Sequence, residues 1–494
     1  MSDEERGKEL DTVDSGFTAR VPSVRRVPGI TIVTHPNAER VGHRAIALPL
    51  LLGEELELSR VHPEFADRDG RPRGPLETTR VSRKPVVLRA LGDGVAIDPG
   101  ETEGVIVGGA PLEGPVRLSG AQLERGVLVE LGRRVSVLLV WMEPAGRPVA
   151  AHGMIGVSES LDEVRRGVDD GAAHDDPVLI TGESGTGKEL VARAIHAASA
   201  RASGPFVAIN MATLVPSMAP SELFGHIKGA FTGAAEDRPG LFRRAQGGTL
   251  FLDEIGDVGV EVQSMLLRAL EAREVTPVGA SMPRPIDVRI LAATDRDLED
   301  AMASGSFRGP LFHRLGAERI ALRPLRERLE DIVPILLSFA PELELRAEHA
   351  RVLLAHRWPG NARELRNIGR WLATGSESRR QPGALAERLG VDTAPVVPLE
   401  AAPSGDLTDD ALVQALHEHG YAIGRTARAL NVSKNYLYKR MADCPQVRRA
   451  RDVTPAEIEA ASDACGGDVQ EMARTLRVSS RGLSLRMTEL GMDR

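Results

Sequence analysis

The sequence predicts a multidomain chain with an N-terminal all-β sandwich, a central α/β domain with a helical lid, and an all-α C-terminal region. Three observations indicate this order. Short runs rich in Val, Ile and Leu, broken by Gly, Pro and Asp, fill residues 28–143. A glycine-rich loop then separates an apolar run from a segment with helical apolar spacing. Further on, residues 408–441 align without gaps onto residues 454–487, which indicates an internal repeat.

Composition and charge exclude several classes of protein. The chain has 494 residues and a formal net charge of -8, so contact with nucleic acid requires a local basic patch. Two cysteines are too few for a disulfide scaffold and indicate a reducing compartment. Residues 1–12 lack the apolar core of a signal peptide, and no run approaches the ~20 apolar residues of a membrane helix. We therefore expect a cytoplasmic protein without a membrane partner.

The N-terminal region divides into two parts. Residues 1–27 are expected to be a disordered leader, and the sandwich is placed at 28–143. Regularly spaced short strands with turn residues between them are typical of this fold. The expected strands include Ile30–Val33, Ala45–Leu51, Val86–Leu88, Val105–Val107, Val127–Leu131 and Val135–Val140.

The central domain is organised around a phosphate-binding loop that follows the apolar run Val178–Ile180. Its glycines let successive backbone N–H groups point at phosphate oxygens, and the helix after it adds a partial positive charge. Lys188 supplies a charge for the terminal phosphates, whereas Glu189 stands where the general motif has Ser or Thr for magnesium. The expected ligand is ATP with Mg²⁺. The loop residues are Gly182, Glu183, Ser184, Gly185, Thr186, Gly187, Lys188 and Glu189.

An acidic pair about 65 residues further along supports this interpretation. Residues 249–252 indicate a buried strand, which ends in Asp253 and Glu254. Ligands bind at the carboxyl ends of strands in parallel sheets. Asp253 can hold magnesium, directly or through water, and Glu254 can polarise the water that attacks the γ-phosphate. Such a pair can also be a solvated turn, but together with the glycine loop it favours ATP hydrolysis.

A third motif, G-A-F-T-G-A, lies between these two elements, and with it the sequence resembles the AAA+ activators of sigma-54 RNA polymerase over about residues 154–375. In that family the loop contacts the sigma factor and moves with the nucleotide state, which implies the sigma-54 holoenzyme as partner. From the residues alone, an apolar tip between glycines suits a protein contact, but a tight turn with Phe231 in the core stays open. The loop residues are Gly229, Ala230, Phe231, Thr232, Gly233 and Ala234.

The resemblance implies a sensing role for three more residues. Asn210 would hydrogen-bond Glu254 and release it when nucleotide is sensed, although a simple cap at the strand end is the alternative. Thr294 matches the first sensor, and Arg363 matches the second, which contacts nucleotide phosphates. From the residues themselves, Asn361 is expected to be the N-cap of the helix that carries Arg363.

Two arginines, Arg308 and Arg314, resemble the arginine fingers of the family, which reach the nucleotide of the neighbouring subunit. They imply a homo-oligomeric ring, expected to be hexameric. Pro310 replaces the usual acidic residue between them, which leaves the local helix geometry in question. The ATPase core is placed at 154–325, its helical lid at 326–392 and a linker rich in Pro and Ala at 393–405.

The sandwich weakly resembles a forkhead-associated domain, a module that binds phosphothreonine. Arg60, Ser82 and Arg83 would contact the phosphate of a phosphothreonine protein, since guanidinium and hydroxyl groups suit it. Pro85 stands where that family has a histidine, so ordinary loop residues are the alternative. The resemblance implies a sensory module in phospho-signalling.

The C-terminal repeats, at 406–444 and 452–494, resemble a tandem Fis-type helix-turn-helix. The resemblance implies binding to upstream activating DNA, and polar and basic residues in the last helix of the first unit suit contacts in a major groove. The second unit can be a structural partner instead. The candidate DNA contacts are Ser433, Lys434, Asn435, Tyr436, Tyr438, Lys439 and Arg440.

These features together predict an ATP-dependent activator of sigma-54 transcription. A regulator of the same ancestry that binds DNA without productive ATP turnover is the first alternative. An AAA+ unfoldase or helicase is the second, and the 229–234 loop and the terminal repeats argue against it.

Overall fold

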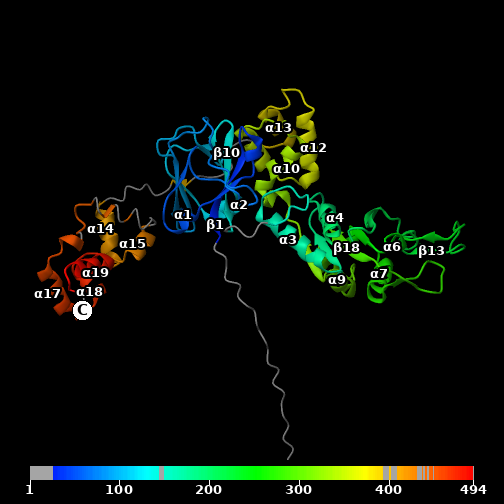
Figure 1. The fold of residues 1–494 in the computed structure, drawn as a ribbon. Coiled ribbons are helices and arrows are strands. Elements are labelled where there is room, and N and C mark those ends of the chain that lie inside the picture. The colour runs from blue at the N-terminus through cyan, green and yellow to red at the C-terminus, as the bar shows by residue number, and fades with distance from the viewer. Residues whose placement is uncertain are drawn as a thin grey trace, which may run out of the picture.

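The computed structural model describes residues 26–143, 149–392, 400–401, 409–430, 437, 440–441, 444–448 and 450–492. In chain order these residues form a β-sandwich, a parallel α/β domain, a group of lid helices and a C-terminal set of helices (Figure 1). None of the helices in the described part of the chain is long and apolar enough to span a bilayer.

The N-terminal sandwich consists of two sheets that enclose one core, which includes Ile32, Leu88 and Val137. The first sheet has the order β2 (Arg44–Ile46), β1 (Val27–Thr34), β10 (Val135–Met142), β9 (Val127–Gly132), β6 (Ile106–Val107) and β7 (Ala110–Pro111). The second has the order β20 (Glu400–Ala401), β8 (Val116–Leu118), β5 (Gly94–Asp98), β4 (Val86–Leu91) and β3 (Leu56–Leu58). Helix α2 (Gly120–Arg125) precedes β9.

One predicted strand of the sandwich, Ala45–Leu51, is wrong in its second half. Strand β2 ends at Ile46, and residues Leu48–Leu51 form the short helix α1. Pro49 lies in the first turn of this helix, where its fixed φ and missing N–H are compatible with helix but not with a sheet interior. The apolar run alone could not separate the two states, because short runs fit either.

The α/β domain has a five-stranded parallel sheet with the order β12 (Phe206–Asn210), β15 (Thr249–Asp253), β18 (Arg289–Thr294), β11 (Val178–Thr181) and β19 (Glu318–Ala321). The apolar runs noted at 178–180 and 249–252 form β11 and β15. Strand β19 was not predicted, because its four residues begin with two charged ones and form no apolar run. The helices of the domain are α3 (Glu159–Ala173), α4 (Lys188–Ala198), α5 (Ala219–Phe224), α6 (Leu241–Arg244), α7 (Val260–Ala272), α8 (Leu298–Ala303) and α9 (Gly309–Leu315).

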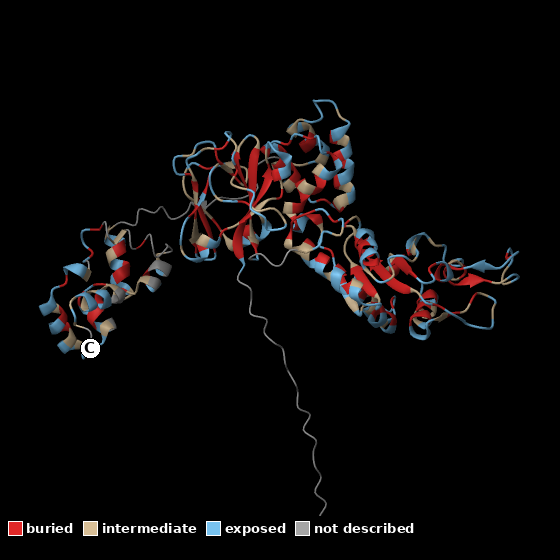
Figure 2. Ribbon diagram, viewed as in Figure 1, coloured by how far each residue is buried: buried red, intermediate tan, exposed pale blue. Residues whose placement is uncertain are grey.

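The lid consists of α10 (Ile332–Phe339), α11 (Ala347–Ala355), α12 (Asn361–Ala373) and α13 (Pro382–Leu389). Its core surrounds Trp358, which is fully buried and donates its indole N–H to the carbonyl of Leu353 at 2.8 Å. The lid lies beside the sandwich, and buried residues run through the strands next to it (Figures 1 and 2).

The C-terminal helices are α14 (Asp409–Glu418), α15 (Ile423–Ala429), α17 (Pro455–Cys465), α18 (Val469–Thr475) and α19 (Ser480–Glu489). In the second unit, α17 to α19 enclose a core that includes Ile458, Met472 and Leu483. Most of the last helix predicted for the first unit lies outside the described residues, including Ser433, Lys434, Asn435, Tyr436, Tyr438 and Lys439. Arg440 is described, and its guanidinium pairs with Asp409 at 3.1 Å.

A fully buried carboxylate, Asp331, joins the start of the α/β domain to the start of the lid. Its oxygens accept hydrogen bonds from the N–H of Val157 at 2.6 Å, the N–H of Ser158 at 2.8 Å and the hydroxyl of Ser158 at 2.7 Å. The guanidinium of Arg328 lies 3.5 Å away. This carboxylate fixes the first segment of the domain against the lid.

Replacing Asp331 with Ala is expected to lower the free energy of unfolding by about 3 kcal/mol, because buried donors and a buried arginine lose their partner. Asp297→Ala is the matched control, since Asp297 also accepts two backbone N–H groups but is exposed at a helix N-cap. The control should cost about 1 kcal/mol. Urea denaturation followed by circular dichroism measures both, and equal losses would contradict the assignment.

Candidate nucleotide-binding site

The phosphate-binding loop connects β11 to α4 at the carboxyl edge of the central sheet. Gly187 is the N-cap of α4 with φ +110°, a conformation that favours glycine. Lys188 is 7% exposed, and its ammonium donates to the carbonyl of Gly182 at 2.8 Å. The loop therefore holds Lys188 at the helix N-terminus, where the dipole favours an anion.

The acidic pair lies at the end of β15, next to this lysine. The Lys188 ammonium is 3.5 Å from the carboxylate of Glu254, which also accepts the N–H of Asp295 at 3.2 Å. Glu254 has φ +53°, an uncommon left-handed value that directs the chain away from the strand. Burial raises the pKa of Glu254 and of Asp253, and Lys188 opposes both shifts. A carboxylate of raised pKa is a stronger base.

The residues fit one magnesium ion bound mainly through the nucleotide. Glu189 is exposed and pairs with Arg193 at 2.6 Å, and Thr186 donates its hydroxyl to the carbonyl of Glu183 at 2.7 Å. Neither side chain thus takes the place of the usual magnesium-binding hydroxyl. Asp253 remains as the carboxylate ligand, and Mg²⁺ often uses one or two carboxylates with phosphates and water.

Two predicted sensor residues lie at the ends of β18 and β12, the strands on either side of β15. Thr294 ends β18, is fully buried, and accepts the N–H of Arg296 at 3.1 Å. Asn210 ends β12, and its side chain accepts the N–H of Ala212 at 2.9 Å. Asn210 thus forms the cap at the strand end that the sequence analysis gave as the alternative to a switch. Its contact with Glu254 stays a prediction.

The lid contacts the loop through the predicted Arg363 and through two arginines that the sequence did not single out. The guanidinium of Arg326 binds both oxygens of Glu183, at 2.6 and 2.9 Å, and lowers the pKa of that carboxyl. Buried Arg328 donates to the carbonyl of Thr186 at 3.3 Å. Arg363, the predicted second sensor, donates to the hydroxyl of Ser184 at 3.2 Å. Three lid arginines therefore lie around the loop.

Asn361 is not the N-cap that the sequence suggested. The N-cap of α12 is Gly360, and Asn361 is the first helical residue, with φ +49° and a fully buried side chain. Its amide donates to Glu183 and to the carbonyl of Ser184, each at 3.1 Å, and accepts the N–H of Leu325 at 2.8 Å. A side chain with donor and acceptor groups can join three segments in this way, which a cap pattern does not reveal.

The two predicted arginine fingers flank the short helix α9. Arg308 is its N-cap residue, and Arg314 lies in its last turn; both side chains are exposed. Pro310 occupies the first turn of α9, where proline is tolerated, so the helix forms despite the missing acidic residue. The exposed guanidinium groups are available to another molecule.

The G-A-F-T-G-A loop lies beyond the short strand β13 (Gly225–His226), which pairs with β14 (Arg238–Pro239) at the end of the molecule away from the sandwich (Figure 1). The N–H of Gly229 donates to the carbonyl of Ala234 at 2.9 Å and closes the loop. Phe231 is half-buried against the edge of His226, with ring centroids 5.0 Å apart, and Thr232 is exposed. The exposure of Phe231 is therefore intermediate between the two possibilities from the sequence, an exposed tip and a turn with Phe231 in the core.

The three candidate phosphopeptide residues lie in adjacent loops of the sandwich. The N–H of Arg60 donates to the carbonyl of Ser82 at 3.1 Å. The Ser82 hydroxyl accepts the N–H of Lys84 at 2.9 Å, and the Arg83 side chain is exposed. The fold therefore brings Arg60 and Ser82 together.

The loop, the acidic strand end and the lid define the central region as a P-loop nucleotide-binding domain of the AAA+ class. Residues 154–321 match the sigma-54 interaction domain family. The transcriptional regulatory protein ZraR of Klebsiella oxytoca is 42% identical over 311 residues, which cover 60% of this chain and 69% of that protein. The chain therefore belongs to the family of sigma-54 transcriptional activators.

Two further similarities extend over part of the chain. The anaerobic nitric oxide reductase transcription regulator NorR of Enterobacter sp. (strain 638) is 47% identical over 234 residues, 44% of this chain and 46% of that protein. The chain spans 44% to 62% of the length of the NorR regulators it matches. NtrX from Brucella abortus in complex with ATP is 32% identical, with 59% of this chain and 69% of that chain covered and a TM-score of 0.45.

Proposed function

We propose that this protein hydrolyses ATP and uses the energy to activate transcription by sigma-54 RNA polymerase. The observation that carries the proposal is the complete G-A-F-T-G-A loop, presented at the end of a domain whose opposite side holds the phosphate-binding loop. A bound ATP–Mg²⁺ would supply the phosphoanhydride bond that is cleaved. Lys188 and the loop N–H groups would bind its phosphates, and Asp253 would hold the magnesium.

Glu254 would act as the general base toward the attacking water. Its carboxylate now lies 3.5 Å from Lys188, and phosphate oxygens would compete for that ammonium and leave Glu254 to accept a proton. Thr294 and Arg363 would sense the phosphates, and Asn210 would restrain Glu254 between turnovers. Arg308 and Arg314 would complete the site of a neighbouring subunit, which makes a homo-oligomeric ring, hexameric by family resemblance, part of the proposal.

The flanking modules would supply location and control. The first C-terminal unit would bind upstream DNA, and the sandwich would act as the sensory module, with Arg60, Ser82 and Arg83 facing a phosphothreonine protein. A regulator that binds DNA without ATP turnover remains the second candidate function. The Lys188–Glu254 pair disfavours it, since a carboxyl of raised pKa placed beside the phosphate-binding lysine suits a general base.

Transcription from a sigma-54 promoter, reconstituted with purified components, tests the proposal. Transcripts are expected with ATP and the full-length protein, and none with a non-hydrolysable analogue. The matched control uses polymerase with a different sigma factor on its own promoter, where the protein should have no effect. Transcripts that do not depend on hydrolysis would favour the second candidate function.

A further inference from the structure

The first sheet of the sandwich has an outer face that is covered rather than exposed to solvent. All eight residues of β1 are buried, and β9 and β10 are buried over most of their length (Figure 2). An antiparallel sheet with one free face shows alternating burial, so continuous burial indicates a second partner. We call this outer face the lid-facing surface; it consists of Thr31, Val33, Leu128, Glu130, Ser136 and Leu138.

The partner of the lid-facing surface is the lid of the same chain. Val33, Leu128 and Leu138 belong to one apolar cluster with lid residues such as Val333 and Leu336. Helices α10 and α11 contact β1, and α11 also contacts β9 and β10. Apolar side chains from two domains in one cluster stabilise the contact by removing their surfaces from water.

A charged contact accompanies this cluster. The guanidinium of Arg351 binds both carboxylate oxygens of Glu130 at 2.9 Å, and Glu130 is 4% exposed. Next to it, the carbonyl of Arg133 accepts the N–H of Ala347 at 3.0 Å, and Arg134 pairs with Glu344. A bidentate pair with a buried carboxylate fixes the relative position of its two elements, because either charge alone would be left without a partner.

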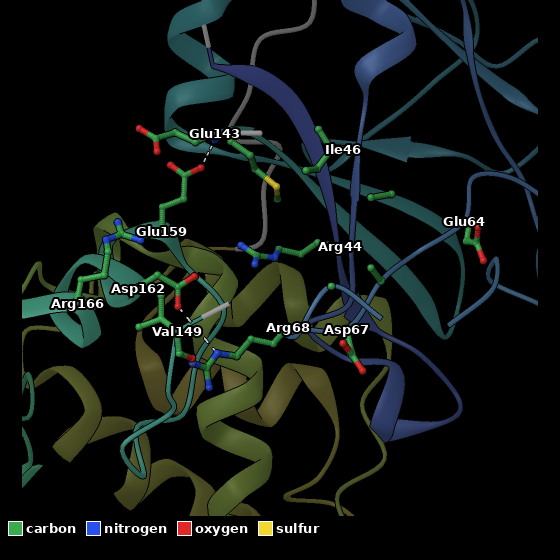
Figure 3. Close-up of a pocket in the computed structure, with 14 residues that line it drawn as sticks. Arg44, Ile46, Glu64, Asp67, Arg68, Glu143, Val149, Glu159, Asp162 and Arg166 are labelled. Atoms are coloured by element: carbon green, nitrogen blue, oxygen red, sulfur yellow. Dashed lines mark hydrogen bonds and ion pairs between the residues drawn. The ribbon is translucent and has the colours of Figure 1, made fainter. Parts of the chain in front are cut away.

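The sandwich also contacts the first residues of the ATPase core and the segment that precedes them. The guanidinium of Arg44 donates to the carbonyl of Val157 at 2.8 Å, and that of Arg68 donates to the carbonyl of Val149 at 2.6 Å. Arg68 also lies 3.9 Å from Asp162 of α3. Figure 3 shows both arginines reaching toward α3 across a cavity of about 300 Å³.

The contact with the lid and the contact with the core meet at Gly42, in the turn before β2. A methyl group built on this glycine would lie 3.0 Å from Val157 of the core and 3.5 Å from Pro334 of the lid. The sandwich therefore contacts both the core and the lid at this point. Lid movement relative to the core must break one of the two sets of contacts, and lid opening limits turnover in many enzymes.

We propose that the sandwich is a brake on the ATPase domain: by contacting lid and core at once, it holds the lid against the phosphate-binding loop and slows ATP turnover. This inference rests on the proposed ATPase function and adds that control by the N-terminal domain is inhibitory. The lid-facing surface is the part of the sandwich that acts, and it is distinct from the loops of Arg60 and Ser82.

Charge reversal across the Glu130–Arg351 pair tests the brake in the full-length protein. Glu130→Arg and Arg351→Glu should each raise ATP turnover about five-fold or more, the lower end of coupling between sites in a protein. The double variant should return turnover toward the wild-type value, because it restores opposite charges. Glu55→Arg and Arg370→Glu, on exposed surfaces of the sandwich and the lid, are the matched controls and should leave turnover unchanged.

Hydrogen exchange on the same variants provides a readout that needs no catalysis. Amides of β9, β10 and α10 to α12 should exchange faster in the single variants and regain protection in the double variant. Unchanged protection, or unchanged or slower turnover in an active protein, would overturn the brake. If neither the wild type nor any variant hydrolyses ATP, the proposed ATPase function is wrong, and so is the predicted effect on turnover. Hydrogen exchange would still show whether the sandwich restrains the lid.

Discussion

Replacing Glu254 with Gln should reduce ATP hydrolysis by about 10²-fold or more, the size of a general-base contribution. The amide has the same shape but cannot accept the proton of the attacking water. Nucleotide affinity should remain, because Lys188 and the loop N–H groups are unchanged, and loss of a carboxylate beside Lys188 removes a competitor for that ammonium. Phosphate release measures turnover, and a fluorescent ATP analogue measures binding.

The matched control for this variant is Glu271→Gln, which changes an exposed glutamate of α7 in the same domain. It should hydrolyse ATP at the wild-type rate. If Glu254→Gln keeps normal turnover, Glu254 is not the base, and its position beside Lys188 has another role.

Replacing Thr232 with Ala should abolish sigma-54-dependent transcription and leave ATP turnover within about two-fold of the wild type. Thr232 is exposed in its loop, so loss of its hydroxyl should not disturb the fold. The loss would then fall on the contact with the sigma factor. Reconstituted transcription and phosphate release, measured on the same preparation, separate the two activities.

Ser281→Ala is the matched control, because Ser281 is an exposed hydroxyl in the loop between β16 (Glu274–Val275) and β17 (Arg284–Pro285), which packs beside the 229–234 loop through Gly279 and Ala230. This variant should support normal transcription. Full transcription with Thr232→Ala would instead place the sigma-54 contact at another surface.

The parts of the site that could be predicted are those encoded over a few neighbouring residues. The loop ending at Lys188 needs glycines at fixed spacing, and the strand before Asp253 needs an apolar run, so both are visible in the sequence. The parallel sheet then brings them together, because the carboxyl ends of its strands share one edge. Strand β19 was missed because it is short and half charged, and helix α1 because a short apolar run fits more than one structure.

The lid contacts could not be predicted because they join segments far apart in the chain. Glu183 meets Arg326, 143 positions away, and nothing local marks one arginine of an arginine-rich chain as its partner. The docking of the sandwich was missed for the same reason, although a signal existed. Val33, Leu128 and Leu138 are apolar at positions that face away from the sandwich core, where a free antiparallel sheet would carry polar residues.

The short strand β20 attaches the segment after the lid to the edge of the sandwich. Glu400 and Ala401 come after the lid but pair with Arg117 and Val116 at the edge of the sandwich. Residues 402–408 connect this strand to α14. A segment of that length spans at most about 25 Å when fully extended. The C-terminal units are thus attached to the N-terminal domain by a short segment, so a rotation of that domain would move them with it.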